Sequence, residues 1–256
     1  MEGDAVRYVA VGDSFTEGVG DELPDGSVRG WADVLAAGLA AALAEPVHYA
    51  NLAVRGRLLT SIMTAQVDAA LALSPAPTMI TLNGGGNDML RPGMQAPRLV
   101  PLIEAAVRRC LDAGVRPVLL CGPDPSQRLP FGRAIRARGD LLTAAVVELG
   151  ARVDVTVVDT FHDAEIRDPG YWSPDRLHLN AAGHHRVAAL ILRGLGYPGP
   201  ATTVDPVAVP AGGVLAEARY YAEHVRPWVM RRMGRRSSGD GRAGKYLDWI
   251  DVPTGG

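Results

Sequence analysis

A serine, a histidine and an aspartate occur in this sequence at positions that would support nucleophilic acyl transfer. Ser14 follows a short apolar run near the start of the chain, and Asp175 precedes His178 by three residues in a polar loop. A serine hydroxyl is a weak nucleophile and needs a neutral imidazole to accept its proton. A carboxylate three residues earlier can reach the other imidazole nitrogen, where it fixes the tautomer and stabilises the imidazolium. The residue types therefore predict Ser14 as nucleophile, His178 as general base and then acid, and Asp175 as its orienting partner.

Attack by such a serine produces a tetrahedral oxyanion, which needs hydrogen-bond donors that are already in place. The candidates are the backbone N–H groups of Ser14 and Gly56 and the side-chain amide of Asn87. A glycine at position 56 would also let an acyl group approach the backbone closely. Each feature has an ordinary alternative: Gly56 as a turn glycine, residues 83–88 as a backbone nest for an anion, and Asp175 as a turn or N-cap residue.

The order of apolar and amphipathic segments predicts how these residues are positioned. Short apolar runs alternate with helical patterns, which is typical of a parallel sheet covered by helices on both faces. The expected strands are residues 6–11, 47–53, 78–82, 115–121 and 153–159. The expected helices are residues 31–44, 58–73, 97–113, 131–149 and 181–195, and Gly150 is expected to end the fourth of them. Since parallel strands end at one edge of a sheet, the loops that carry the candidate residues should meet there.

The character of the sequence changes after Gly196. Residues 197–213 are rich in proline, glycine and valine and predict a linker, whereas residues 215–233 predict a further helix that is broken at Pro227. Residues 246–250 are apolar enough to dock back on the domain. We therefore expect a catalytic domain over residues 1–196 and a C-terminal extension over residues 197–256, consisting of a linker and a helix packed on the domain.

Composition excludes several classes of partner. The net charge of −2 gives no reason to expect nucleic acid, although the arginines of residues 231–236 could contact phosphate instead of simply ending a solvated helix. No apolar run reaches the roughly 18 residues of a membrane helix. The first residues show no secretion signal, so we expect a cytoplasmic protein without membrane insertion. Oligomeric state has no signal in the sequence.

The cysteines and most histidines have no expected catalytic role. Cys110 and Cys121 are expected to be small buried thiols instead of a disulfide. His184 and His185 are adjacent and therefore point in different directions on a helix, and neither pairs with His178 at a ligand spacing. We therefore predict no metal and no other cofactor. His48, His162 and His224 look isolated.

Taken together, these stretches resemble the GDSL esterases and lipases of the SGNH hydrolase superfamily. The resemblance runs from Val6 to about Leu195, with Phe15 standing where leucine is usual. The matching blocks are Gly12-Asp13-Ser14, Gly56, Gly86-Asn87-Asp88 and Asp175-Arg176-Leu177-His178. The resemblance implies a three-layer α/β/α flavodoxin-like fold with a five-stranded parallel sheet in the order 2-1-3-4-5. It also implies metal-free hydrolysis of esters through an acyl-enzyme on Ser14, with Ser14, Gly56 and Asn87 as oxyanion donors.

We therefore predict that the protein is a serine esterase that acts on small to medium acyl esters. The loops expected to select the substrate, residues 18–30, 91–97, 122–130 and 160–171, do not identify it. The Gly-x-Ser-x-Gly motif of α/β-hydrolases is absent. An acyltransferase could use the same residues if an alcohol or amine outcompetes water. A non-catalytic binding domain should have lost Ser14, His178 or Asn87, and all three are present.

Overall fold

The strands of this protein form one mostly parallel sheet. The computed structural model describes residues 5–91, 93–200, 203–208, 220, 223 and 238–255. Within them, the sheet has the order β5-β4-β3-β1-β2-β6. The strands are β1 (Arg7–Val11), β2 (Val47–Asn51), β3 (Met79–Asn83), β4 (Arg116–Cys121), β5 (Thr156–Asp159) and β6 (Tyr246–Val252). The first five are parallel and follow the predicted order 2-1-3-4-5.

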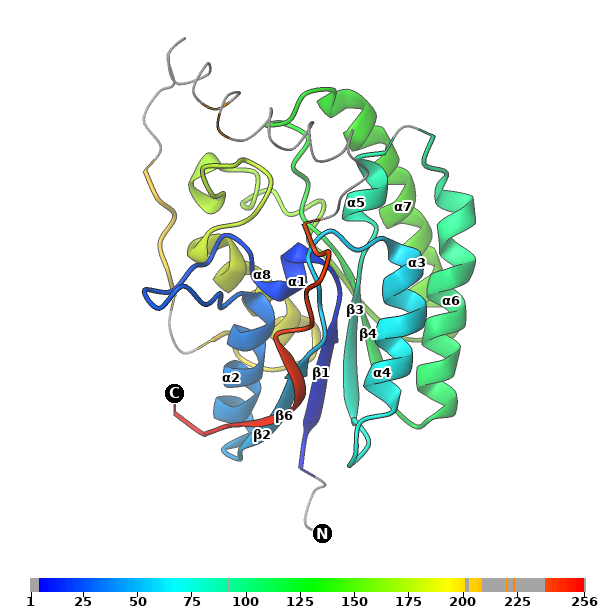
Figure 1. The fold of residues 1–256 in the computed structure, drawn as a ribbon, viewed down its shortest axis with the longest axis vertical. Coiled ribbons are helices and arrows are strands. Elements are labelled where there is room, and N and C mark those ends of the chain that lie inside the picture. The colour runs from blue at the N-terminus through cyan, green and yellow to red at the C-terminus, as the bar shows by residue number, and fades with distance from the viewer. Residues whose placement is uncertain are drawn as a thin grey trace.

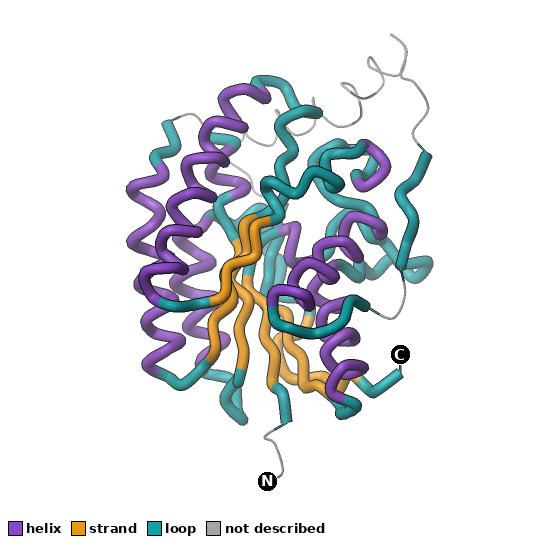
Figure 2. Tube along the Cα trace, turned by 180° about the vertical axis from the view of Figure 1, so that it is seen from behind, coloured by secondary structure: helices purple, strands orange, loops and turns teal. Residues whose placement is uncertain are grey.

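Helices cover both faces of the sheet, so the predicted three-layer architecture is confirmed (Figure 1, Figure 2). One layer consists of α2 (Trp31–Leu43) and α8 (Ala181–Gly194). The other consists of α3 (Leu59–Ser61), a π-helical turn (Ile62–Gln66), α4 (Val67–Leu71), α6 (Ala96–Asp112) and α7 (Gly132–Val153). The described residues also contain short helical turns at α1 (Ser14–Glu17) and α5 (Gly86–Met89) and a 3-10 turn (Pro169–Tyr171).

The central strand β1 shows why the sequence forms a layered core. Its side chains alternate between the two faces. Tyr8 and Ala10 belong to the apolar cluster under α2 and α8, whereas Val9 and Val11 belong to the cluster under α6 and α7. All four residues are fully buried. Burial on both faces is what makes a parallel strand a continuous apolar run.

Within the described residues the sheet has six strands, where five were predicted. Residues 246–250 do dock on the domain, but as part of β6, which pairs antiparallel with β2 at the edge of the sheet. The seven residues of β6 are half-buried or exposed, without a clean two-residue alternation of burial. An edge strand of this kind lacks the periodic signal that marks the other strands. Of the helix predicted over residues 215–233 the structure describes Tyr220 and Glu223 alone, and the arginine cluster at 231–236 lies outside the described residues.

The end of α7 also differs from the prediction. Gly150 does not end this helix; the helix continues to Val153 and ends where Asp154 adopts a left-handed conformation with φ 54°. A Cβ at position 150 would clash with Cγ2 of Val157 on β5. The missing side chain at this position therefore lets the helix lie close against the sheet.

Two further expectations concern single features. Cys110 and Cys121 are buried free thiols, as predicted. In the part of the chain that the structure describes, none of the helices combines the length and the apolar character needed to cross a membrane.

Candidate active site

Ser14 is the first residue of α1, immediately beyond the end of the central strand. The carboxylate of Asp13 caps this short helix by accepting the N–H of Phe15 at 3.1 Å. The helix ends after one turn at Gly18, whose φ of 102° is accessible mainly to glycine. Phe15, the departure from the usual leucine, packs beneath the turn with its ring centroid 5.7 Å from that of Trp31. The serine is therefore held on a tight, well-supported turn.

Gly12, the residue after β1, is held by the side chain of Gln66, which the sequence analysis did not predict. Gln66 closes the π-helical turn and is buried. Its Oε1 accepts the N–H of Gly12 at 2.8 Å, and its Nε2 donates to the carbonyl of Gly12 at 2.9 Å. Both backbone groups of this residue are thus satisfied two positions before Ser14. A glutamine 54 positions away in the sequence gives no local signal of this contact.

The structure brings Ser14, His178 and Asp175 together in one line. Ser14 Oγ lies 2.9 Å from Nε2 of His178, and Nδ1 of His178 lies 2.5 Å from Oδ2 of Asp175. The other carboxylate oxygen of Asp175 accepts the N–H groups of Leu177 and His178, each at 2.9 Å. The side chains of His178 and Asp175 are only 17% and 29% exposed. This is the geometry in which an imidazole can take a proton from a serine hydroxyl.

The pKa values of the two carboxylates in the site, Asp175 and Asp13, are shifted in opposite directions. Burial alone would raise the pKa of Asp175, but the hydrogen bond and positive charge of His178 outweigh it and hold this pKa well below its usual value. Asp175 is therefore ionised whenever the histidine works. Burial raises the pKa of Asp13 to about 6, although the N–H of Phe15 and the charge of His178 oppose the change.

Two of the expected oxyanion donors are unoccupied backbone groups. Among the described residues, no acceptor receives the N–H of Ser14 or the N–H of Gly56. Gly56 has a φ of 77°, which explains a glycine at this position. The third expected donor, Asn87, is already engaged: its Nδ2 donates to Asp13 Oδ2 and to the carbonyl of Arg57, each at 3.1 Å. The amide lies in the site, but both of its hydrogens have acceptors.

A cavity of about 100 Å³ opens beside the serine. Ser14, Asn87 and His178 line its polar part. Its apolar wall lies between the sheet and the helices α6 and α7, and includes Leu59, Met63, Leu82, Ile103, Leu119, Leu142, Val146 and Phe161. Gly56 is not among the described residues that line this cavity. The two parts together suit a ligand with one polar reacting end and a short apolar tail.

His184 is a second histidine close to the site, and it has a structural role that the sequence did not reveal. Its Nδ1 accepts the N–H of Trp31 at 3.1 Å, and its Nε2 lies 3.3 Å from the carbonyl of Val19. Burial lowers the pKa of His184 to about 4, so the imidazole is neutral and ties the start of α2 to the chain after α1. Its ring also stacks on Phe15.

The histidines that looked isolated do have partners where the structure describes them. His48 lies 2.6 Å from Asp251 on β6, and His162 contacts two carboxylates, Asp159 and Asp140. His224 lies outside the described residues. Across the described ranges, no three histidine, cysteine, aspartate or glutamate side chains form a group that could hold a metal ion.

Comparison with known proteins identifies related sequences and folds. The model of the GDSL-like lipase/acylhydrolase family matches residues 10–186. A lipase from a goat rumen metagenome has 19% sequence identity and a TM-score of 0.63, over 76% of this chain and 99% of that chain. The protein TesA has 22% identity and a TM-score of 0.60, over 74% of this chain and 97% of its own.

A third solved structure and a sequence search complete the comparison. An acetylxylan esterase from Geobacillus stearothermophilus has 16% identity and a TM-score of 0.58, over 77% of this chain and 97% of that chain. At such identities the structural likenesses establish a shared fold. No curated protein sequence matches this chain.

Proposed function

The chain belongs to the GDSL-like lipase/acylhydrolase family and is a carboxylic ester hydrolase, and from this premise we propose that it cleaves esters through an acyl-enzyme on Ser14. The observation that carries the proposal is the line of atoms from Ser14 Oγ through the imidazole of His178 to the carboxylate of Asp175, with separations of 2.9 and 2.5 Å. His48, His162 and His184 contact carboxylates or backbone groups instead of a serine hydroxyl.

The reaction follows from these contacts in two halves. In the first, Ser14 Oγ attacks the ester carbonyl carbon while His178 Nε2 takes the hydroxyl proton. The tetrahedral intermediate collapses when the imidazolium returns that proton to the departing alkoxide, which leaves as an alcohol. In the second half, water attacks the acyl group, His178 takes its proton, and Ser14 recovers the proton as the acid leaves. Asp175, ionised throughout, stabilises the imidazolium in both halves.

The oxyanion formed in each half requires donors, for which the N–H groups of Ser14 and Gly56 have no competing acceptor in the described chain. Asn87 is the third proposed donor. Because its hydrogens point at Asp13 and at the carbonyl of Arg57, one of them must turn toward the oxyanion as negative charge develops. The charged oxyanion is a stronger acceptor than the neutral carbonyl of Arg57, so this exchange favours the transition state over the ground state.

The cavity supports a substrate with a small to medium acyl group. Its volume of about 100 Å³ is smaller than an engineered protein cavity of about 150 Å³ that binds benzene. Its mostly apolar wall would stabilise an aliphatic tail by removing it from water. A long acyl chain would have to leave the cavity.

The decisive experiment labels the enzyme with a fluorophosphonate and maps the modified peptide by mass spectrometry, beside a series of chromogenic esters of increasing acyl length. We expect the label on Ser14, and kcat/KM that rises over the first few carbons and then falls. A label on another residue, together with full hydrolysis by the Ser14→Ala variant, would refute the proposed nucleophile.

A further inference from the structure

The C-terminal extension lies outside the segment that matches the family, and yet it returns to the edge of the proposed site. Its last strand, β6, begins beside the carboxyl end of β2, where Tyr246 pairs with Asn51, and runs antiparallel to β2 away from that edge (Figure 1). Just before β6, two glycines lie directly against the chain that follows β2. A Cβ at Gly244 would lie 2.7 Å from Cα of Leu52, and a Cβ at the buried Gly239 would clash with the carbonyl oxygen of Arg55. The backbone of the extension is therefore in direct contact with the backbone of the chain that follows β2.

The contact at Arg55 falls on the peptide that carries a proposed oxyanion donor. The carbonyl oxygen of Arg55 and the N–H of Gly56 belong to one planar trans peptide, in which they point in opposite directions. Any group that holds the oxygen in place also fixes the direction of the N–H. Gly239 occupies that position on the side of the oxygen.

The same residue is held from the other side by the helix that carries the proposed nucleophile. Glu17 stands three residues after Ser14, and its side chain is 10% exposed. Its Oε2 accepts the N–H of Arg55 at 2.7 Å, and its Oε1 accepts Nε of the guanidinium at 2.8 Å. Arg55 is thus clamped between α1, through its N–H and side chain, and the extension, through its carbonyl.

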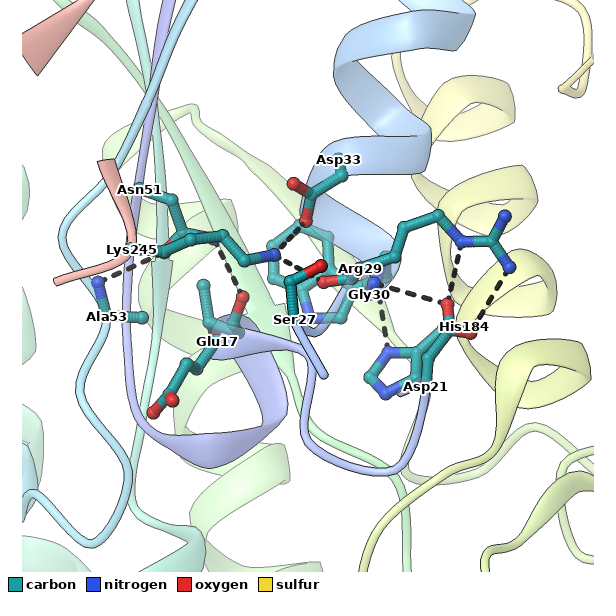
Figure 3. A network of polar contacts seen from close by, with 12 residues as sticks. Glu17, Asp21, Ser27, Arg29, Gly30, Asp33, Asn51, Ala53, His184 and Lys245 are labelled. Atoms are coloured by element: carbon teal, nitrogen blue, oxygen red, sulfur yellow. Dashed lines mark hydrogen bonds and ion pairs between the residues drawn. The ribbon is translucent and has the colours of Figure 1, made fainter. Parts of the chain in front are cut away.

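The extension itself is anchored by a buried ion pair. Lys245, the only lysine of the chain, donates from Nζ to Oδ2 of Asp33 at 2.7 Å and to the carbonyl of Arg29 at 2.6 Å (Figure 3). The side chains of this pair are mostly buried, at 11% and 17% exposure. Removing one partner of such a pair leaves the other charge uncompensated. The anchor therefore holds the segment before β6 in one place.

We propose that the C-terminal extension is a positioning element of the active site, which fixes the N–H of Gly56 through the contact between Gly239 and the carbonyl of Arg55. The inference rests on the proposed function, since it concerns the stabilisation of the oxyanion. It gives the extension a role in catalysis, with Gly239 acting through another residue and touching no substrate.

The test is the Gly239→Ala variant of the full chain, with Gly199→Ala as matched control. Both glycines lie in the extension with an ordinary φ, but a Cβ at Gly199 would meet only Cβ of Ala189 at 4.0 Å. We expect kcat of Gly239→Ala to fall by about 10- to 100-fold, because a misplaced donor costs nearly as much as a missing one. KM should change little, the thermal midpoint should fall by a few degrees because the backbone beside Gly239 must move, and Gly199→Ala should behave as wild type.

A second readout is specific to the oxyanion donors. Phosphonylation of Ser14 by a fluorophosphonate places a phosphoryl oxygen where the oxyanion would lie, so its rate constant should fall in parallel with kcat. Lys245→Gln, which loosens the anchor without adding volume beside Arg55, should show the same pattern with a smaller loss. This variant keeps the test valid if Gly239→Ala folds poorly.

The outcomes separate this inference from the function on which it rests. Folded variants with kcat and phosphonylation rates within twofold of wild type, while the wild type is labelled on Ser14, would overturn the positioning role alone. Absence of label on Ser14 in the wild type would overturn both the proposed nucleophile and the role of the extension.

Discussion

Two turns of this protein share the pattern Asp-x-x-His and nearly the same local geometry. In both, one carboxylate oxygen accepts the backbone N–H of the histidine, at 2.9 Å for Asp175 and 3.2 Å for Asp159. In both, the other oxygen contacts Nδ1 of the imidazole, at 2.5 Å in His178 and 2.7 Å in His162. Each turn lies at the carboxyl edge of the sheet, where Asp159 ends β5 and His178 contacts Ser14 beyond β1. Up to this point nothing distinguishes them.

The two turns differ in the group that contacts Nε2, the second nitrogen of each imidazole. Nε2 of His178 faces Ser14 Oγ at 2.9 Å, whereas Nε2 of His162 faces the carboxylate of Asp140 at 3.0 Å. The hydrogen bond to Asp159, followed by that to Asp140, raises the pKa of His162. A histidine held between two carboxylates keeps its proton to a higher pH than a free imidazole, which suits an ion pair. The pattern therefore orients an imidazole, and the fold decides whether it can act as a base.

The largest effect is expected from removing the group that distinguishes the two turns. Ser14→Ala should lower kcat by up to ~10⁶-fold, because the acyl-enzyme can no longer form. Steady-state hydrolysis of a chromogenic ester measures it, and an unchanged thermal midpoint shows that the variant is folded. Near wild-type turnover would contradict the proposed role of Ser14.

The two aspartates provide a matched pair. Asp175→Asn should reduce kcat by about 10⁴-fold, since an amide neither fixes the reactive tautomer nor stabilises the imidazolium. Asp159→Asn makes the same chemical change in the other turn and should leave kcat within about twofold. Parallel pH–rate profiles of the two variants test this contrast. Equal losses in both would mean that the comparison between the turns is wrong.

Asn87→Ala tests a proposed oxyanion donor, which the site around His178 needs and the ion pair of His162 does not. The expected loss in kcat is about 10²- to 10³-fold, with KM little changed, because the amide stabilises the negative charge that develops in the transition state and not the bound ester. Comparison of kcat and KM for one good ester measures the loss. A change of less than a few-fold would remove Asn87 from the proposed set of donors.

The smallest effect concerns the second turn and appears in stability instead of rate. Because the pKa of His162 is raised above its ordinary value of 6.5, its ion pairs stabilise the folded state fully below pH 6.5, and this contribution is lost as pH rises through the higher folded-state pKa. His162 is 43% exposed, so the contribution is modest. Denaturant unfolding of wild type and His162→Gln should diverge at pH 5.5 and converge at high pH. A difference that grows with pH would contradict this assignment.

Much of the fold could be predicted because its signals are local. The five parallel strands and the long helices follow from apolar runs that alternate with helical patterns, as in Val6 to Val11 and Trp31 to Leu43. The order of the strands came from the resemblance to the GDSL esterases and lipases, and it is confirmed. The strand β6 could not be predicted, because an exposed edge strand has no periodic apolar pattern. Gly150 misled the prediction because a glycine that allows close packing looks the same in sequence as one that ends a helix.

The site shows the same division. Order and spacing predicted that Ser14, His178 and Asp175 would lie together, and they do. Gln66 and His184 could not be found, because each acts through a contact with residues far away in the chain. Residue types also placed Asn87 in the site, but could not reveal that its hydrogens are already given to Asp13 and Arg57. Hydrogen bonds of this kind between distant residues form only in the folded chain.

The pairing of β2 with β6 has a consequence for biosynthesis. His48 on β2 and Asp251 on β6 are 203 positions apart, so a ribosome adding roughly 5–20 residues per second needs about 10–40 s between them. Throughout that interval the nascent sheet presents an unpaired edge to other newly made chains. Translation that stops early would leave the edge permanently open, which makes shortened products of this protein candidates for aggregation and for rapid removal by cellular quality control.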